Sequence, residues 1–271
     1  MRVLISVDIE GVAGVSRPEQ TQAGALDYDT ARRLMTEEAN AAIRGAFAAG
    51  ATDVVAADAH GSFGNLLPDR LDPRARLAHG KPRPHGMVQG IDETIEAVML
   101  VGYHAMAGAH GVLSHTIRGT AFHRIWLNGR PVGEAMLYGL FVGEHGAKVV
   151  MASGDDAFAA ETREWLPHAR FAVVKQAVGH RAAVSLSPEK ARALIEAEAK
   201  AGLAGIGKAR VLRIDPPLTC RVEAKSLVLA DLFAVLPGAR RPEPLAVEFT
   251  AACVGDVLGV LQLFSAASAS I

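Results

Sequence analysis

The chain has 271 residues, of which half are apolar and 21% are charged, a composition typical of a globular protein large enough to bury a full core. A formal net charge of −1 without a basic stretch argues against nucleic acid as a partner, and no apolar run approaches the ~18 residues that a membrane span needs. Only two cysteines occur, Cys220 and Cys253, far apart and in no metal-binding spacing. Together with the absence of a signal-peptide pattern before the first strand, they predict a cytoplasmic protein.

The first predicted element is a buried strand over residues 3–7, rich in β-branched side chains and followed by two acids, Asp8 and Glu10. Side chains alternate along a strand, so these two carboxylates are expected to point the same way. Adjacent carboxylates at the end of a buried strand repel each other and are costly to desolvate. The pattern therefore predicts a positively charged group between them.

A helix is predicted over about residues 29–49, and its Glu37-Glu38 pair is interpreted as part of a solvated face. With a second strand over residues 53–57, it forms a strand–helix–strand unit, which predicts parallel strands. Further elements are expected in this order: a short strand near 75–78, a short helix over 91–97, a strand over 98–102, a strand over 124–127, a helix over 131–143 and a strand over 148–152. This alternation predicts an α/β fold, with a mostly parallel sheet flanked by helices in the N-terminal two-thirds.

The last third has a different character, because its strands are not followed by acids or histidines. The expected strands cover residues 171–175, 210–214, 219–223 and 245–249, and the expected helices cover residues 188–200, 227–236 and 254–264. We therefore expect a metal-binding α/β catalytic domain over residues 1–180 and a smaller α+β domain over residues 181–271.

Acids and histidines follow each of the three early strands. Asp8 and Glu10 follow the first, His60 follows the second and His104 follows the third. The carboxyl ends of parallel strands lie on one edge of the sheet, so these side chains should converge there. Glu134, at the start of a helix and directly after a glycine, is a further candidate.

This donor set suits divalent metals of the zinc type. Five ligands are too many for one tetrahedral zinc with an open position, but they fit two metals if one carboxylate bridges. We expect Asp8 to bridge, with Glu10 and His104 on one metal and His60 and Glu134 on the other. Two metals about 3.5–4 Å apart hold a shared water and lower its pKa, which is hydrolytic chemistry.

Two more residues have roles that the sequence leaves open. Asp58 either orients a ligand histidine or only caps a turn. His115 lies in a loop of small residues after the third strand, where it can act as general base, general acid or orienting donor, or be a surface histidine. His110 and His123 share that region and compete for any such role.

Several short motifs, taken in order, resemble one family. They are Ser-Val-Asp-Ile-Glu-Gly-Val-Ala-Gly at 6–14, Met-Thr-Glu-Glu-Ala-Asn at 35–40, Gly-Tyr-His-Ala at 102–105, Gly-Val-Leu-Ser-His at 111–115 and Arg-Pro-Val-Gly-Glu at 130–134. Their order and spacing are similar to those of the DppA-type dinuclear zinc D-aminopeptidase family of metallopeptidases. The match runs from residue 1 to about residue 190 and continues more weakly towards the C-terminus.

The resemblance implies a hydrolase that releases the N-terminal residue of short peptides, with D-amino-acid peptides such as D-Ala-D-Ala among the expected substrates. It also implies two Zn²⁺ per subunit, a catalytic role for the residue matching His115, and a ring-like homo-decamer whose sites face an inner chamber. In the family, the zinc ligands match these positions: Asp8, Glu10, His60, His104 and Glu134.

Three alternatives stay open at the level of sequence. The enzyme could be an L-specific aminopeptidase, or the same metals could hydrolyse a phosphoester or a non-peptide amide. The chain could also be a non-catalytic assembly protein that keeps its metal for stability. These classes are separated by comparing the turnover of D- and L-alanyl anilides with the turnover of a bis-aryl phosphate, each measured with and without chelator.

Overall fold

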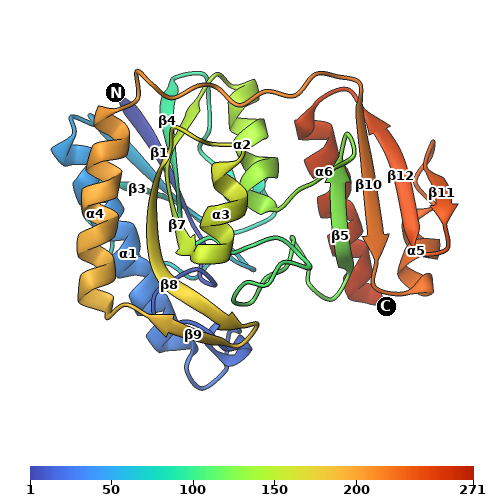
Figure 1. Ribbon diagram of the computed structural model, residues 1–271, viewed down its shortest axis with the longest axis horizontal. Coiled ribbons are helices and arrows are strands. Elements are labelled where there is room, and N and C mark those ends of the chain that lie inside the picture. Colours follow the sequence, from blue (N-terminus) through green and yellow to red (C-terminus); the bar gives the residue numbers. More distant parts are fainter. The chain divides into compact units, whose positions relative to one another are not determined.

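The computed structural model describes residues 1–271, which divide into two compact units (Figure 1). The larger unit comprises Met1–Ala105, His110–Leu113 and Val142–Leu212. The second unit comprises the remaining segments, Met106–Ala109, Ser114–Phe141 and Arg213–Ile271. Helix α2 (Glu134–Glu144) begins in the second unit and ends in the larger one.

The larger unit is built on a seven-stranded sheet in the order β3-β2-β1-β4-β7-β8-β9. All of its strand pairs are parallel except β8 with β9. The strands are β1 (Arg2–Val7), β2 (Asp53–Asp58), β3 (Arg76–Ala78), β4 (Ile95–Val101), β7 (Lys148–Asp155), β8 (Arg170–Gly179) and β9 (Ala182–Ser185). The helices are α1 (Tyr28–Ala48), α3 (Asp156–Arg163) and α4 (Pro188–Ala204), with short 3₁₀ turns η1 (Pro18–Gln20) and η2 (Gly86–Val88). The predicted mostly parallel α/β sheet is confirmed.

Helices α1 and α4 lie side by side against this sheet (Figure 1). Ile43 of α1 and Ile195 of α4 are fully buried in one apolar core with Ile5 of β1. Gly45 permits the close approach of the two helices, because a Cβ there would lie 2.4 Å from the carbonyl oxygen of Glu196. The paired helices thus form a fixed layer behind the central strands.

The second unit contains a five-stranded antiparallel sheet in the order β11-β12-β10-β5-β6. Its strands are β5 (Phe122–Leu127), β6 (Arg130–Pro131), β10 (Leu218–Ala224), β11 (Arg240–Glu243) and β12 (Ala246–Ala251). The accompanying helices are α5 (Leu227–Phe233) and α6 (Val254–Ala267), followed by the 3₁₀ turn η3 (Ser268–Ser270). Aromatic rings fill its core: Phe233 stacks on Phe264 at 4.3 Å between ring centroids and on Phe122 at 5.6 Å.

The division of the chain into these two units differs from the single domain boundary expected at residue 180. Strand β5 belongs with the C-terminal strands because it pairs with β10. Strand β9 and helix α4 stay with the larger unit, because β9 pairs with β8 and α4 packs on α1. The chain therefore crosses between the units more than once, which a single boundary does not describe.

Two local predictions are wrong. Residues 91–97 do not form a helix: β4 begins at Ile95, and Asp92 forms a tight turn by accepting hydrogen bonds from Thr94. That segment holds too few residues for a helix before the β-branched run begins. Residues 210–214 form no strand and run as irregular chain.

The register of the central strands positions the candidate site. Val7 at the end of β1 pairs with Asp58 of β2 and with Val101 of β4. The three strands therefore end at the same level, with β1 between its two neighbours, and this switch point is where open α/β sheets place their ligands. Separately, none of the helices combines the length and apolar character that crossing a bilayer requires.

Candidate metal centre

Asp8 and Glu10 lie in a turn, because β1 ends at Val7. The prediction that alternation along a strand aligns them therefore does not describe how they converge. Both carboxylates nevertheless face the ring of His60: its Nδ1 lies 3.2 Å from Asp8 Oδ1 and 3.0 Å from Glu10 Oε2. The two acids are only 2% and 4% exposed, so their charges are desolvated together.

Two glycines make this turn possible. The Gly11 backbone N–H donates to the Gly102 carbonyl at 2.7 Å, and a Cβ on Gly11 would lie 1.9 Å from the carbonyl oxygen of Tyr103. Gly102 has a φ of +69°, and a Cβ there would lie 2.3 Å from the carbonyl oxygen of Asp8. The turns after β1 and β4 thus press backbone against backbone, which only glycine permits.

Backbone carbonyls fix how the two histidines present their nitrogens. His60 Nε2 lies 2.8 Å from the Thr21 carbonyl oxygen, and His104 Nδ1 lies 3.0 Å from that of Ala105. A carbonyl only accepts, so these nitrogens carry the protons when the rings are neutral. The lone pairs of His60 Nδ1 and His104 Nε2 then face the carboxylates, as a metal ligand requires.

The carboxylate of Asp8 lies between the two rings. Its Oδ1 is 3.2 Å from His60 Nδ1, and its Oδ2 is 3.4 Å from His104 Nε2. One ligand atom each from Asp8, Glu10 and His104 also lies within 4.8 Å of the others. Two buried carboxylates and two imidazole lone pairs aimed at one small space fit a divalent cation of the zinc type.

The electrostatics agree with that fit. Burial acts to lower the pKa of His60, but the nearby carboxylates of Glu10 and Asp8 outweigh it and raise that pKa well above its usual range. Carboxylates that raise the pKa of a neighbouring histidine this far also attract other positive charges. A metal ion supplies that charge without protonating the ligand.

Asp58 anchors the loop that carries His60. Its Oδ2 accepts from the backbone N–H of Leu66 at 2.7 Å, and its Oδ1 accepts from Asn65 Nδ2 at 2.8 Å and from the His60 backbone N–H at 3.3 Å. Its hydrogen bonds reach the backbone of His60 and not the ring. Of the two roles left open by the sequence, the structure favours the turn cap.

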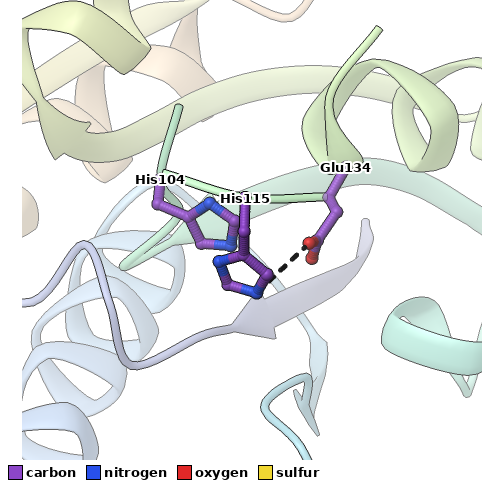
Figure 2. A group of neighbouring side chains, drawn as sticks. All are labelled: His104, His115 and Glu134. Atoms are coloured by element: carbon purple, nitrogen blue, oxygen red, sulfur yellow. Dashed lines mark ion pairs between the residues drawn. The ribbon is translucent and has the colours of Figure 1, made fainter. Parts of the chain in front are cut away.

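The second unit contains a carboxylate and a histidine that face each other. His115 Nε2 lies 3.8 Å from Glu134 Oε1, as the dashed line in Figure 2 marks. Glu134 is the first residue of α2, where a helix N-terminus favours negative charge, and its Oε1 also accepts the Ile117 backbone N–H at 2.5 Å. The competing histidines, His110 and His123, are both exposed.

Sequence reasoning missed a buried lysine beneath the Glu10 turn. Lys175 of β8 donates from Nζ to the carbonyl oxygens of Glu10 at 2.5 Å, Val12 at 3.0 Å and Val15 at 2.6 Å. Burial lowers the pKa of Lys175 to about 8, although nearby carboxylates, led by Asp155, act to raise it. The available signal was a lysine that directly follows the apolar run of residues 171–174 in this strand.

Glu38 was interpreted wrongly as part of a solvated helix face. It is buried, and its Oε1 accepts the Ala13 backbone N–H at 2.9 Å. Burial raises the pKa of this carboxyl to about 7, against the opposing effects of that hydrogen bond and of Lys175. Glu38 and Lys175 therefore hold the same turn from two sides.

Comparisons with known proteins agree with this arrangement. The family model for D-aminopeptidase matches residues 1–263. Over 217 residues, the chain is 37% identical to a D-aminopeptidase of Bacillus subtilis (strain 168), covering 80% of this chain and 78% of the relative. The solved structure of the Zn-dependent D-aminopeptidase DppA from Bacillus subtilis, a self-compartmentalizing protease, matches with a TM-score of 0.95 and 31% identity, over 98% of this chain and 97% of that chain. The resemblance of the short motifs is thereby confirmed, and the chain belongs to the D-aminopeptidase family.

Proposed function

We propose that the protein is a zinc-dependent aminopeptidase that hydrolyses short peptides from the N-terminus, with D-amino-acid peptides such as D-Ala-D-Ala as substrates. The observation that carries this proposal is the buried donor set in which Asp8 and Glu10 face the lone pairs of His60 and His104. Membership of the D-aminopeptidase family and the zinc dependence of the solved relative support the choice of reaction and of metal.

Two Zn²⁺ per subunit are proposed, with Asp8 as the bridge because its two oxygens face different histidines. Glu10 and His60 would hold one ion, and His104 and Glu134 the other. This distribution differs from the one expected from the sequence, since Glu10 Oε2 lies 3.0 Å from His60 Nδ1. When bound, two zinc ions supply a water of lowered pKa and polarise the scissile carbonyl.

His115 is proposed as the catalytic residue, which transfers a proton during peptide cleavage. Its side chain is 25% exposed, so a substrate can reach it, and its Nε2 faces the Glu134 carboxylate. A carboxylate near an imidazole orients the ring, and an oriented imidazole can deliver a proton to the leaving amine.

We also propose that the subunits assemble into a ring-like homo-decamer in the cytoplasm, without nucleic acid or membrane partners. The description of the solved relative as a self-compartmentalizing protease supports an assembly. Sites that face an inner chamber would admit only short peptides, which fits the proposed substrates.

A panel of D- and L-configured dipeptides, assayed with metal analysis on the same sample, tests the proposal. We expect cleavage of D-Ala-D-Ala, loss of activity with a chelator and recovery with zinc. His115→Ala should keep its zinc and lose about 10²–10⁴-fold in kcat. Faster cleavage of L-dipeptides would indicate an L-specific enzyme, and turnover of a bis-aryl phosphate alone would indicate a phosphoesterase. A protein that neither carries zinc nor gains activity with it would contradict the proposal.

A further inference from the structure

Lys175 is a buried cation with all of its hydrogen bonds directed at one turn. It is 2% exposed, in a strand that is not adjacent to β1 in the sheet. Its ammonium group has three N–H donors, and three backbone carbonyls of residues 10–15 accept from it. One side chain thereby holds the first, third and last residues of the segment Glu10–Val15.

That segment carries Glu10. Its other carbonyl bonds lie further along: Gly14 accepts from Gln20 Nε2 at 2.9 Å, and Val12 also accepts from the Val15 backbone N–H at 3.1 Å. Its N–H groups are held separately: Gly11 donates to Gly102, and Ala13 donates to Glu38. The carbonyl of Glu10 itself lies 2.5 Å from Lys175 Nζ, so the lysine sets the orientation of the peptide unit that follows the Glu10 side chain. The Glu10 side chain leaves the Cα next to that carbonyl, so the position of its carboxylate depends on the same orientation.

We propose that Lys175 is a positioning residue for the metal centre, which holds the 10–15 turn so that the Glu10 carboxylate meets His60 Nδ1. This inference rests on the proposed function, because the consequence of the positioning is zinc binding. The three hydrogen bonds that Lys175 donates all end on backbone oxygens, so it acts through the position of Glu10 and takes no part in the reaction itself.

The test compares Lys175→Met with Lys175→Gln, which keeps two N–H donors but loses the charge. Zinc affinity is measured for both by competition with a chromophoric chelator, and folding is checked by circular dichroism. Lys175→Met should weaken one of the two zinc sites by about 10–100-fold, the range found for groups that orient metal ligands, and leave the other within a few-fold. Lys175→Gln should lie between Lys175→Met and the wild type.

A double-mutant cycle with Glu10→Ala shows whether Lys175 affects zinc binding through Glu10. If Lys175 acts through Glu10, adding Lys175→Met or Lys175→Gln to Glu10→Ala should weaken zinc binding little further. Ile195→Ala, a buried position on α4 of the same unit, is the control for simple destabilisation: it should lower the melting temperature and leave both zinc affinities unchanged.

The outcomes separate the inference from the function on which it rests. A wild-type protein that binds no zinc contradicts the proposed function. A wild type that binds two zinc ions, with a folded Lys175 variant of unchanged affinity or with fully additive losses in the cycle, overturns the positioning role. If Lys175→Met does not fold, the cycle is measured with Lys175→Gln, and the same criteria apply.

Discussion

Asp8 and Glu10 are two residues apart, but their carboxylates have different neighbours. Asp8 offers one oxygen to His60 and the other to His104, whereas Glu10 faces His60. We therefore expect Asp8→Ala to lose both zinc ions and Glu10→Ala to keep about one per subunit, since only a bridging ligand serves both metals. Metal analysis after dialysis against a weak chelator measures the difference.

The matched control for these variants is Glu189→Ala, which removes an exposed carboxylate from the first turn of α4. It should retain the zinc content of the wild type. Equal zinc loss in Asp8→Ala and Glu10→Ala would show that Asp8 is not the bridge.

Glu38 gives the fold a specific pH dependence. Burial raises its pKa from 4.5 to about 7, so the folded state prefers the protonated carboxyl. A raised carboxyl pKa contributes stability that is complete below pH 4.5 and is lost as the pH rises through 7. In chelator, Glu38→Gln should match the wild type near pH 5 and have a free energy of unfolding higher by about 2–3 kcal/mol near pH 7.5.

Urea unfolding of both proteins at the two pH values measures this change. The difference between variant and wild type isolates Glu38 from the other titrating groups. Glutamine keeps an oxygen that accepts the Ala13 N–H. The substitution therefore removes the titrating group and retains this hydrogen bond. A difference that stays constant with pH would show that Glu38 is already ionised in the folded protein.

At the scale of elements, the turns after β1 and β4 depend on each other. A Cβ on Gly11 would lie 1.9 Å from the Tyr103 carbonyl, one residue before His104. Gly11→Ala should therefore push the two turns apart, lower the melting temperature by several degrees and reduce zinc content, as steric strain in a packed site costs roughly 1–3 kcal/mol. Calorimetry and metal analysis on one preparation test this.

Gly179 is the control position for that substitution. It lies at the end of β8, and a Cβ there meets nothing within 4 Å. Gly179→Ala should leave the melting temperature and the zinc content unchanged. If Gly11→Ala behaves in the same way, the contact between the two turns does not position the metal ligands.

These elements also show what the sequence could predict. The apolar runs of β1, β2 and β4 identified the central strands, and parallel pairing was enough to bring Asp8, His60 and His104 to one edge. The turn geometry was not predictable, because strand alternation gives no information once the strand ends at Val7. Strand β9 was not predicted, because its four residues are too short a run to show alternation and it forms by pairing with β8.

Long-range contacts explain why the burial of Lys175 and Glu38 was not predicted from the sequence. Lys175 binds carbonyl groups that lie 160 or more positions earlier in the chain. Glu38 is buried because its helix turns that side chain towards Ala13, although Glu37 beside it is partly exposed. Local patterns indicate which residues are polar, but the tertiary packing decides whether a polar side chain meets water or a buried partner.

At the scale of the whole molecule, zinc binding should couple to the stability of the larger unit, which carries four of the proposed ligands: Asp8, Glu10, His60 and His104. Zinc that binds only the folded protein stabilises it by about 4 kcal/mol at a thousandfold excess over its Kd. The stabilisation should therefore be visible in the larger unit, and each unit contains one of the two tryptophans, Trp165 in the larger and Trp126 in the second.

Single-tryptophan variants report each unit separately. Trp126→Phe leaves Trp165 as the probe, and Trp165→Phe leaves Trp126. We expect zinc to raise the midpoint that Trp165 reports above its value in chelator. Adding Asp8→Ala should remove this shift, and in chelator it should not destabilise the protein, because it relieves the repulsion between buried carboxylates. A Trp165 midpoint that zinc leaves unchanged would contradict a metal centre built on the four ligands of the larger unit.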